Sequence, residues 1–275
     1  MNNFVLFGNP IKHSKSPYIH NFFSNQINIK YFYYLYEILD TNDFEPNFIN
    51  FFLQNGNNGA NITIPFKERA FNLCNLLTEN AKLSESVNTI KKNSNGEIIG
   101  ENTDGLGLLY DLKRLNFIKN NINKVLIIGS GGASKGIIPS LIKNKCNILL
   151  TNRTIDKSEN IKNMFYKKNI YIDVMPYDKI YNYNFDIVIN STSSGIDNKI
   201  PNISEKIVNS KTKYYDLFYD TKNETPFIKW CKSNGAKFVS DGLGMLICQA
   251  AFSCLFWHNK MPNPINLINK FYEKD

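Results

Sequence analysis

Short apolar runs alternate with amphipathic stretches along the first hundred residues. Runs typical of strands occur at residues 3–7, 30–38, 60–64, 87–92 and 97–100. Helical patterns occur at residues 16–27, 44–53, 66–77 and 103–115. The last two strands flank Asn95-Gly96, a dipeptide typical of a hairpin turn. This part of the chain therefore predicts an α/β domain.

From residue 124 onwards the alternation becomes more regular. Expected strands lie at residues 124–128, 146–151, 185–190, 213–218 and 237–240, with helical stretches between them. This repeated order predicts a doubly wound parallel sheet. After Asp241-Gly242, apolar residues recur on one helical face, at Leu243, Leu246, Ile247, Ala250 and Cys254. We expect this last helix to return to the first domain.

The pattern thus predicts two α/β domains, the first of them discontinuous. We expect residues 1–102 and 242–275 to form the first domain and residues 103–241 to form the second. No proline-rich linker marks a boundary, and the polar stretch Lys119–Asn123 is the best candidate for a break before the strand at 124.

A glycine-rich turn follows the apolar run at 125–128. The turn contains Gly129, Gly131 and Gly132, with Ser134 where the common dinucleotide fingerprint has its third glycine. Such a turn lets the backbone approach a pyrophosphate at a helix N-terminus. Asn152-Arg153-Thr154 follows the next strand, where such folds bind the adenosine ribose, and an arginine there suits a 2′-phosphate. The sequence therefore predicts an NADP(H) site on a Rossmann-like domain.

Four polar clusters in the first half are candidates for substrate binding. They are Ser14-Lys15-Ser16-Pro17, the run from Asn61 to Lys67, Ser86 to Thr89, and Gly100 to Gly105. Each also has an ordinary structural explanation. Ser16 could be a helix N-cap, Lys67 an exposed lysine, Asn88 an exposed strand-end residue and Asp104 an acid in a helix cap region.

Lys67 and Asp104 suggest chemistry because of where they stand. Lys67 falls in the first turn of a predicted helix, where a cation is unfavourable against the helix dipole. A lysine held by a carboxylate can deliver a proton to a ketone oxygen as hydride reaches the carbon. Asn61 and Thr63 would share one face of a strand and could bind one polyhydroxylated ligand.

Composition excludes several other classes of protein. Hydrophobic residues make up 43% of the chain, enough for a buried core, and runs such as 31–36 are too short to span a bilayer. The five cysteines show no C-x-x-C spacing. The absence of such spacing is typical of a reduced cytoplasmic protein. His13, His20 and His258 lack metal-ligand spacing, so we expect no metal.

The net charge of +8 does not predict nucleic-acid binding, because the lysines are scattered and form no basic groove lined by aromatic residues. The charge mildly favours anionic small molecules. We therefore expect a small-molecule substrate and neither a nucleic-acid nor a membrane partner. A homodimer is left open, because no sequence feature sets the oligomeric state.

Taken together, the motifs resemble the NADP-dependent bacterial type of shikimate dehydrogenase. The matching stretches run in family order from Phe7 to Ala251 and include S-K-S-P, N-I-T-I-P-F-K, N-T-D-G, G-S-G-G-A-S, T-N-R-T and D-G-L-G-M-L. The resemblance implies reversible NADPH-dependent reduction of 3-dehydroshikimate to shikimate, in the chorismate pathway to aromatic amino acids.

The resemblance also implies roles for individual residues. Lys67 and Asp104 would be the catalytic pair. The substrate would contact Ser14, Ser16, Asn61, Thr63, Lys67, Asn88, Asp104, Tyr219 and Gln249. The cofactor would contact Gly129, Ser130, Gly131, Gly132, Ala133, Asn152, Arg153, Thr154, Lys157, Leu217 and Gly242.

One departure and two alternatives accompany this interpretation. Many NADP-type members carry a second arginine where this chain has Lys157, which keeps the charge but loses the flat guanidinium. The nearest alternative is a quinate/shikimate dehydrogenase that uses NAD, although such members favour an acid where this chain has Arg153. A catalytically idle relative that only binds ligands is the second, although Lys67 and Asp104 are both present.

Overall fold

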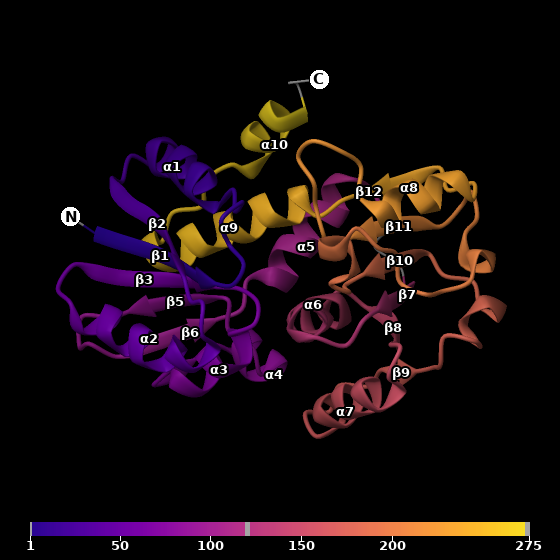
Figure 1. Cartoon of the computed structure of the whole chain (residues 1–275), viewed down its shortest axis with the longest axis horizontal. Helices are drawn as coiled ribbons and strands as arrows, with labels where there is room; N and C mark the ends of the chain where they lie inside the picture. Colours follow the sequence, from indigo (N-terminus) through magenta and orange to yellow (C-terminus); the bar gives the residue numbers. More distant parts are fainter. Residues whose placement is uncertain (1, 119–121, 273–275) are drawn as a thin grey trace. The chain divides into compact units, whose positions relative to one another are not determined.

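The computed structural model describes residues 2–118 and 122–272, and the chain folds into two compact units (Figure 1). One unit combines Met1–Gly107 with Ile247–Asp275, and the other is Leu108–Leu246. The domain boundaries expected from the sequence, after residue 102 and after residue 241, lie at the starts of helices α5 (Asp104–Arg114) and α9 (Leu243–His258). The division lies inside both helices because Leu108 and Met245 already pack into the core of the second unit. Residues 119–121 of the proposed break lie outside the described residues.

The first unit contains a six-stranded mixed sheet. Its strands, in spatial order, are β2 (Tyr31–Glu37), β1 (Asn2–Gly8), β3 (Asn57–Ile62), β5 (Thr89–Lys92), β6 (Ile98–Glu101) and β4 (Leu76–Leu77). β1 pairs in parallel with both neighbours, whereas β5 runs antiparallel to β3 and β6. Its other helices are α1 (Ser16–Ile27), α2 (Phe44–Leu53), α3 (Lys67–Leu73), α4 (Glu79–Ser84) and α10 (Pro264–Tyr272).

Alternation along β1 fills both faces of this sheet, since successive side chains of a strand point to opposite sides. Phe7 packs in a buried cluster with Phe44 and Phe48 of α2. Phe4 lies on the opposite face, and the centroid of its ring is 4.4 Å from that of the Trp257 ring of α9. The central strand is therefore covered by helices from both ends of the sequence.

Pairing within the sheet overrides part of the expected helical pattern. The helix expected at 66–77 ends at Leu73, and Leu76–Leu77 instead forms β4, which pairs in parallel with β6. Thr78 then caps α4, accepting a hydrogen bond from the Ala81 backbone N–H. Leu76 and Leu77, which the pattern predicted to end a helix, form a strand because β6 has an edge with which they can pair.

The second unit confirms the expected doubly wound parallel sheet. Its strands, in spatial order, are β12 (Phe238–Ser240), β11 (Lys213–Asp216), β10 (Ile187–Asn190), β7 (Asn123–Ile128), β8 (Cys146–Thr151) and β9 (Asp173–Val174). All the pairings are parallel. The helices of the unit are α6 (Gly132–Lys143), α7 (Ile155–Tyr166) and α8 (Pro226–Ser233). Short 3₁₀ turns occur at Thr41–Asp43 in the first unit and at Ile180–Asn182, Ser194–Asp197 and Glu205–Ile207 in the second.

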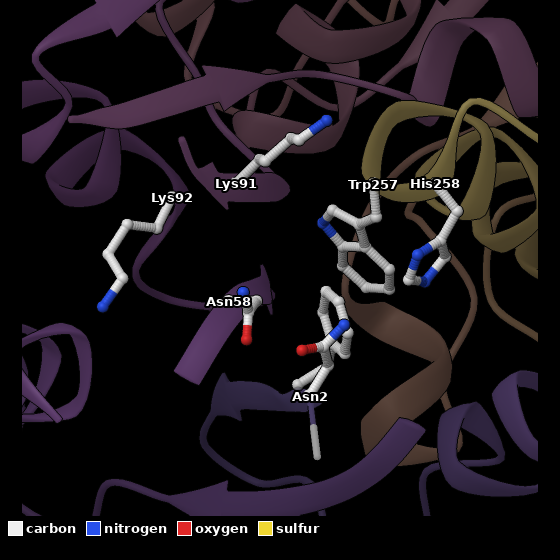
Figure 2. A pocket seen from close by; sticks show the side chains of 7 residues that line it. Asn2, Asn58, Lys91, Lys92, Trp257 and His258 are labelled. Carbon is white, nitrogen blue, oxygen red and sulfur yellow. The ribbon is translucent and has the colours of Figure 1, made fainter. Parts of the chain in front are cut away.

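A small cavity of about 70 Å³ opens in the first unit (Figure 2). Its lining residues are Asn2, Phe4, Asn58, Lys91, Lys92, Trp257 and His258. The two lysines extend in different directions (Figure 2), because Lys91 donates to the Phe256 carbonyl at 3.1 Å and Lys92 to the Phe52 carbonyl at 2.8 Å. Both carbonyls lie near helix C-termini, whose partial negative charge favours a cation. These lysines therefore stabilise α9 and α2.

Across the described ranges, 2–118 and 122–272, no helix combines the length and apolar character needed to cross a membrane.

Candidate functional site

Lys67 and Asp104 form a close ion pair in the first unit. Lys67 is the first residue of α3, which follows β3, and Asp104 is the first residue of α5, which follows β6. The Lys67 Nζ donates to Asp104 Oδ2 at 2.6 Å, and the two side chains are only 16% and 6% exposed. Because little water screens it, this pair interacts more strongly than an exposed one. Lys67 is thus not an exposed surface lysine.

Asn88 holds the Asp104 carboxylate, and Asn102 holds the Asp104 backbone N–H. Asn88 Nδ2 donates to Asp104 Oδ1 at 2.7 Å, and Asn88 Oδ1 accepts from the Thr103 N–H at 2.9 Å. Asn88 is buried, so its interpretation as an exposed strand-end residue is wrong. Asn102 Oδ1 accepts from the Asp104 N–H at 3.1 Å and supplies the local turn contact. Both oxygens of Asp104 therefore remain available to Asn88 and Lys67.

Helix α9 brings residues from the far end of the sequence to this cluster. Gln249 Oε1 accepts from Asn88 Nδ2 at 3.3 Å, and Ser253, one turn later, accepts from Asn61 Nδ2 at 3.1 Å. α9 can approach α5 because residue 107 is a glycine: a Cβ on Gly107 would lie 2.6 Å from the Gln249 backbone nitrogen. Hydrogen bonds thus join Lys67, Asp104, Asn88, Gln249 and, through Ser253 and Thr89, Asn61.

Three hydroxyl residues in this cluster were not identified from the sequence. Thr89, Thr103 and Ser253 are buried and hydrogen-bond to one another and to the asparagines. Thr89 and Thr103 lie inside two of the polar clusters, so a signal was present for them. Ser253 follows Gln249 by four residues, a spacing that puts both side chains on one helix face.

The serines before α1 differ from the simplest expectation. α1 begins at Ser16, and Ser14 Oγ accepts from the Ser16 N–H at 3.2 Å. Ser16 is therefore not the N-cap, and its interpretation as an ordinary cap is wrong. Ser14 also donates to Ser16 Oγ at 3.1 Å. Thr63 lies just past the end of β3, half-buried, with its methyl group so close to Gly8 that a Cβ there would lie 2.3 Å from it.

The glycine turn of the second unit lies at the switch point of its sheet. β7 pairs with β8 on one side and with β10 on the other, the arrangement at which such sheets bind ligands. Gly129 has φ +112°, and a Cβ there would lie 2.9 Å from Ser191 Oγ. Gly131 caps α6 without a side-chain hydrogen bond, and a Cβ there would meet nothing within 4 Å. The N-terminus of α6 is therefore accessible to an anion.

The residues expected to bind the 2′-phosphate follow β8. Arg153 and Thr154 are exposed, as is Lys157 in the first turn of α7. Asn152 Nδ2 donates to the Thr154 carbonyl at 3.0 Å, which shapes the turn. The Ser130 and Ser158 hydroxyls, 2.8 Å apart, join the glycine turn to α7. The basic side chains and the glycine turn thus follow the carboxyl ends of two neighbouring strands, β8 and β7.

Leu217 and Gly242 come together beyond the ends of β11 and β12. The Gly242 N–H donates to the Phe218 carbonyl at 3.1 Å, and a Cβ on Gly242 would lie 2.2 Å from the Leu217 oxygen. Tyr219 is half-buried two residues after Leu217. Asp216 holds the start of this segment by accepting from Thr225 Oγ1 at 2.7 Å, and burial raises the pKa of Asp216 to about 7.

Comparisons with known proteins give one family for both units. A model of the shikimate dehydrogenase substrate binding domain matches residues 6–90, and a model of shikimate / quinate 5-dehydrogenase matches residues 111–216. Together they match more than half of the chain.

Solved structures agree with these matches over almost the whole chain. An Ael1 enzyme from Pseudomonas putida is 31% identical, with a TM-score of 0.88 over 98% of both chains. Shikimate dehydrogenase from Aquifex aeolicus is 27% identical, with a TM-score of 0.87 over 99% of this chain and 97% of the other. A shikimate dehydrogenase in complex with NADP⁺ is 28% identical, with a TM-score of 0.87 over 100% of this chain and 96% of the other. The chain therefore belongs to the shikimate dehydrogenase family of oxidoreductases.

Proposed function

We propose that this chain catalyses the reversible NADPH-dependent reduction of 3-dehydroshikimate to shikimate, a step towards chorismate and the aromatic amino acids. The observation that carries the proposal is the 2.6 Å pair between Lys67 and Asp104, held by Asn88 in a cluster of polar side chains. Such a pair combines a proton donor with the group that orients it.

Lys67 has the central role in this proposal. NADPH, when bound, supplies a hydride to the carbonyl carbon of the substrate. The Lys67 ammonium donates a proton to the carbonyl oxygen, and the amine recovers that proton from the hydroxyl in the reverse direction. Asp104 orients the ammonium and stabilises its charge. This geometry lowers the entropic cost of bringing donor and oxygen together.

The remaining polar residues of the first unit would bind the substrate. Asn61, Asn88 and Gln249 would hold the ring hydroxyls, because amides both donate and accept hydrogen bonds. Ser14, Ser16 and Thr63 would bind the carboxylate, which accepts from hydroxyl groups. The family resemblance also gives Tyr219 as a substrate contact.

The residues of the second unit fit a dinucleotide. Gly129 has a positive φ and no room for a Cβ, and Gly131 leaves the α6 N-terminus open. The segment from Gly129 to Ala133, including Ser130 and Gly132, would therefore hold the pyrophosphate. Asn152, Arg153, Thr154 and Lys157 would bind the 2′-phosphate, and Leu217 and Gly242 would lie beside the nicotinamide. A 28% identical relative was crystallised with NADP⁺, which supports this choice of cofactor.

A cytoplasmic location belongs to the same proposal. All five cysteines are free thiols and four of them are buried, which suits a compartment that keeps thiols reduced.

The test is a set of parallel assays with purified protein and shikimate, containing either NADP⁺ or NAD⁺, read by near-ultraviolet absorbance of the reduced cofactor. Quinate replaces shikimate in a second pair. Reduction of NADP⁺ by shikimate alone is the expected result. Comparable rates with NAD⁺ and quinate would identify a quinate/shikimate dehydrogenase of broad specificity. Absence of turnover, with shikimate or NADP⁺ still bound in calorimetry, would identify a ligand-binding relative.

A further inference from the structure

The phenol of Tyr215 joins three elements of the second unit. Tyr215 lies on β11 and is fully buried. Its hydroxyl donates to Asp111 Oδ2 of α5 at 2.8 Å and accepts from the Met245 backbone N–H, in the first turn of α9, at 3.2 Å. Burial raises the pKa of Tyr215 well above its usual value, so the phenol keeps the proton that it donates. One hydroxyl group thus bridges α5 and α9.

The Asp111 carboxylate is also held on its other side. Arg114 Nε donates to Asp111 Oδ1 at 2.7 Å, and Asp111 is fully buried. Gly244 of α9 packs directly against this carboxylate, because a Cβ on Gly244 would overlap both of its oxygens. The carboxylate therefore lies beside the N-terminus of α9, where the partial positive charge of the helix favours an anion. Asp111 and Tyr215 together fix the first turn of α9 against α5.

On α5, Asp111 shares a face with Asp104 of the candidate site. Asp104, Gly107 and Asp111 follow one another at intervals of three and four residues, which places them along one side of the helix. Gly107 is a point of close approach to α9, because a Cβ there would lie 2.6 Å from the Gln249 backbone nitrogen. The side of α5 that carries Asp104 therefore packs on α9 over about two turns.

On α9, the contact with Tyr215 lies one turn before Gln249. Gln249 follows Met245 by four residues, so the two lie on the same side of the helix. Gln249 Oε1 accepts from Asn88 Nδ2 at 3.3 Å, and the same nitrogen donates to the Asp104 carboxylate at 2.7 Å. Gln249 can make this contact only if α9 packs on α5 with the observed rotation and register.

Apolar packing alone constrains the rotation of α9 less than a hydrogen bond does. Buried apolar residues occur around most of the helix, for example Met245, Ile247 and Ala250. The hydrophobic effect is non-directional, whereas a hydrogen bond requires a defined distance and angle. A polar anchor in the first turn therefore adds a constraint that the apolar surface of α9 does not supply.

We infer that Tyr215 is a positioning residue of the proposed reaction, acting through α9 on Gln249. The phenol fixes the first turn of α9 against Asp111, and this sets the rotation and register of α9 on α5. Gln249, one turn later, is thereby held where its amide meets Asn88 and binds a hydroxyl of the substrate. The inference rests on the proposed function, because it takes shikimate as the ligand of Gln249.

The test compares Tyr215→Phe with Tyr214→Phe, its neighbour on β11. Tyr214 is equally buried, and its hydroxyl also makes two hydrogen bonds, donating to the Ile207 carbonyl at 2.9 Å and accepting from the Asn209 N–H at 2.8 Å. The two tyrosines belong to different core clusters, because neighbouring side chains of a strand point to opposite faces. Both variants thus lose the same chemical group, but only one of them loses an anchor of α9.

For Tyr215→Phe we expect the KM for shikimate to rise about three- to tenfold, as for the loss of one hydrogen bond. The kcat should stay within about twofold, because Lys67 and Asp104 are untouched. Tyr214→Phe should lower the melting temperature by a similar amount and keep the KM of the wild type. Equal KM values for the two variants would overturn the inference, because the role of Tyr215 would then be structural only.

A double variant tests whether the effect passes through Gln249. Gln249→Ala alone should raise the KM for shikimate. If Tyr215 acts through Gln249, adding Tyr215→Phe should change this KM by less than about twofold. Increases that multiply would show that Tyr215 acts on another part of the site and would contradict the inference.

Amide hydrogen exchange of the wild-type protein requires no variant to fold. Coupling between two sites is reciprocal, so shikimate bound at Gln249 must in turn stabilise the first turn of α9. We expect exchange of the Met245 N–H to slow about three- to tenfold at saturating shikimate. The control is the Ile228 N–H, the third residue of α8, which donates to the Thr225 hydroxyl at 3.3 Å. Slowing that is no larger at Met245 than at Ile228 would refute the coupling.

Failure of the inference can be distinguished from failure of the proposed function. Wild-type protein that oxidises shikimate, together with any of the contrary results above, would remove the role of Tyr215 and leave the proposed function intact. Wild-type protein that neither oxidises shikimate nor binds it in calorimetry would overturn the proposed function and this inference with it.

Discussion

Replacing Lys67 with alanine tests the proposed chemistry most directly. The substitution removes the proton donor and leaves Asp104 with Asn88 as its remaining side-chain partner. General acid catalysis contributes about 10²–10⁴-fold, which corresponds to about 3–5 kcal/mol of the activation barrier. We therefore expect kcat to fall by this factor while the KM for shikimate changes little.

The size of the expected loss separates catalysis from stability. Loss of a hydrogen bond between charged groups costs about 2 kcal/mol of folding free energy. The free energy of unfolding of a native protein is about 5–15 kcal/mol, so the variant should remain almost entirely folded. A fall of about a hundredfold or more in kcat therefore cannot come from unfolding. Circular dichroism and a thermal melt on the same sample check this directly.

Two further variants sharpen the comparison. Lys67→Arg keeps a positive charge near Asp104, but a guanidinium does not give up its proton, so kcat should remain low while shikimate still binds. Lys92→Ala removes a lysine from the same unit, one that donates to the Phe52 carbonyl, and should leave kcat unchanged. A Lys67→Ala variant with a raised KM and an unchanged kcat would refute a catalytic role, because the lysine would then only bind substrate.

The remaining predictions concern the second unit. Arg153→Ala should raise the KM for NADP⁺ by about 10–100-fold, because it removes a charged hydrogen bond, and should leave the KM for NAD⁺ unchanged. Equal increases in KM for both cofactors would contradict recognition of the 2′-phosphate. Lys157→Arg should lower the KM for NADP⁺ by about fivefold, because a guanidinium can bind phosphate through two hydrogen bonds; steady-state kinetics would show no change if Lys157 lies away from the cofactor. Asp216 has a folded-state pKa of about 7, above its ordinary 3.8, so its contribution to the free energy of unfolding falls as pH rises from about 4 to 7. Asp216→Asn, whose amide can donate to Thr225, should therefore gain stability relative to wild type between pH 5 and pH 8 in urea unfolding, and a difference independent of pH would refute this.

Local features of the sequence predicted much of the second unit correctly. Buried parallel strands read as short apolar runs, so β7, β8, β10, β11 and β12 could be found without a structure. The two-residue strand β9 was missed, because two residues give no periodic signal. The position of Lys67 at a helix start was also predicted, since Pro65 ends the preceding strand nearby.

The candidate site was predicted in part. The polar clusters identified Lys67, Asn88 and Asp104, but the sequence could not say that all three touch. It also missed Tyr33, which stands in an apolar, aromatic strand and looks like an ordinary core residue. Its hydroxyl donates to Asn61 Oδ1 only because β2 and β3 belong to the same sheet.

The sequence by itself determined most strands and helices, the glycine turn and the residue types of the site, because periodicity and turn chemistry act between residues close along the chain. Tertiary structure alone decided which distant groups meet. Thr89 and Ser253 are 164 residues apart and share a hydrogen bond, and Leu76–Leu77 becomes a strand only because β6 lies beside it. Such contacts depend on how whole elements pack, and the free energy of that packing is not contained in any local pattern.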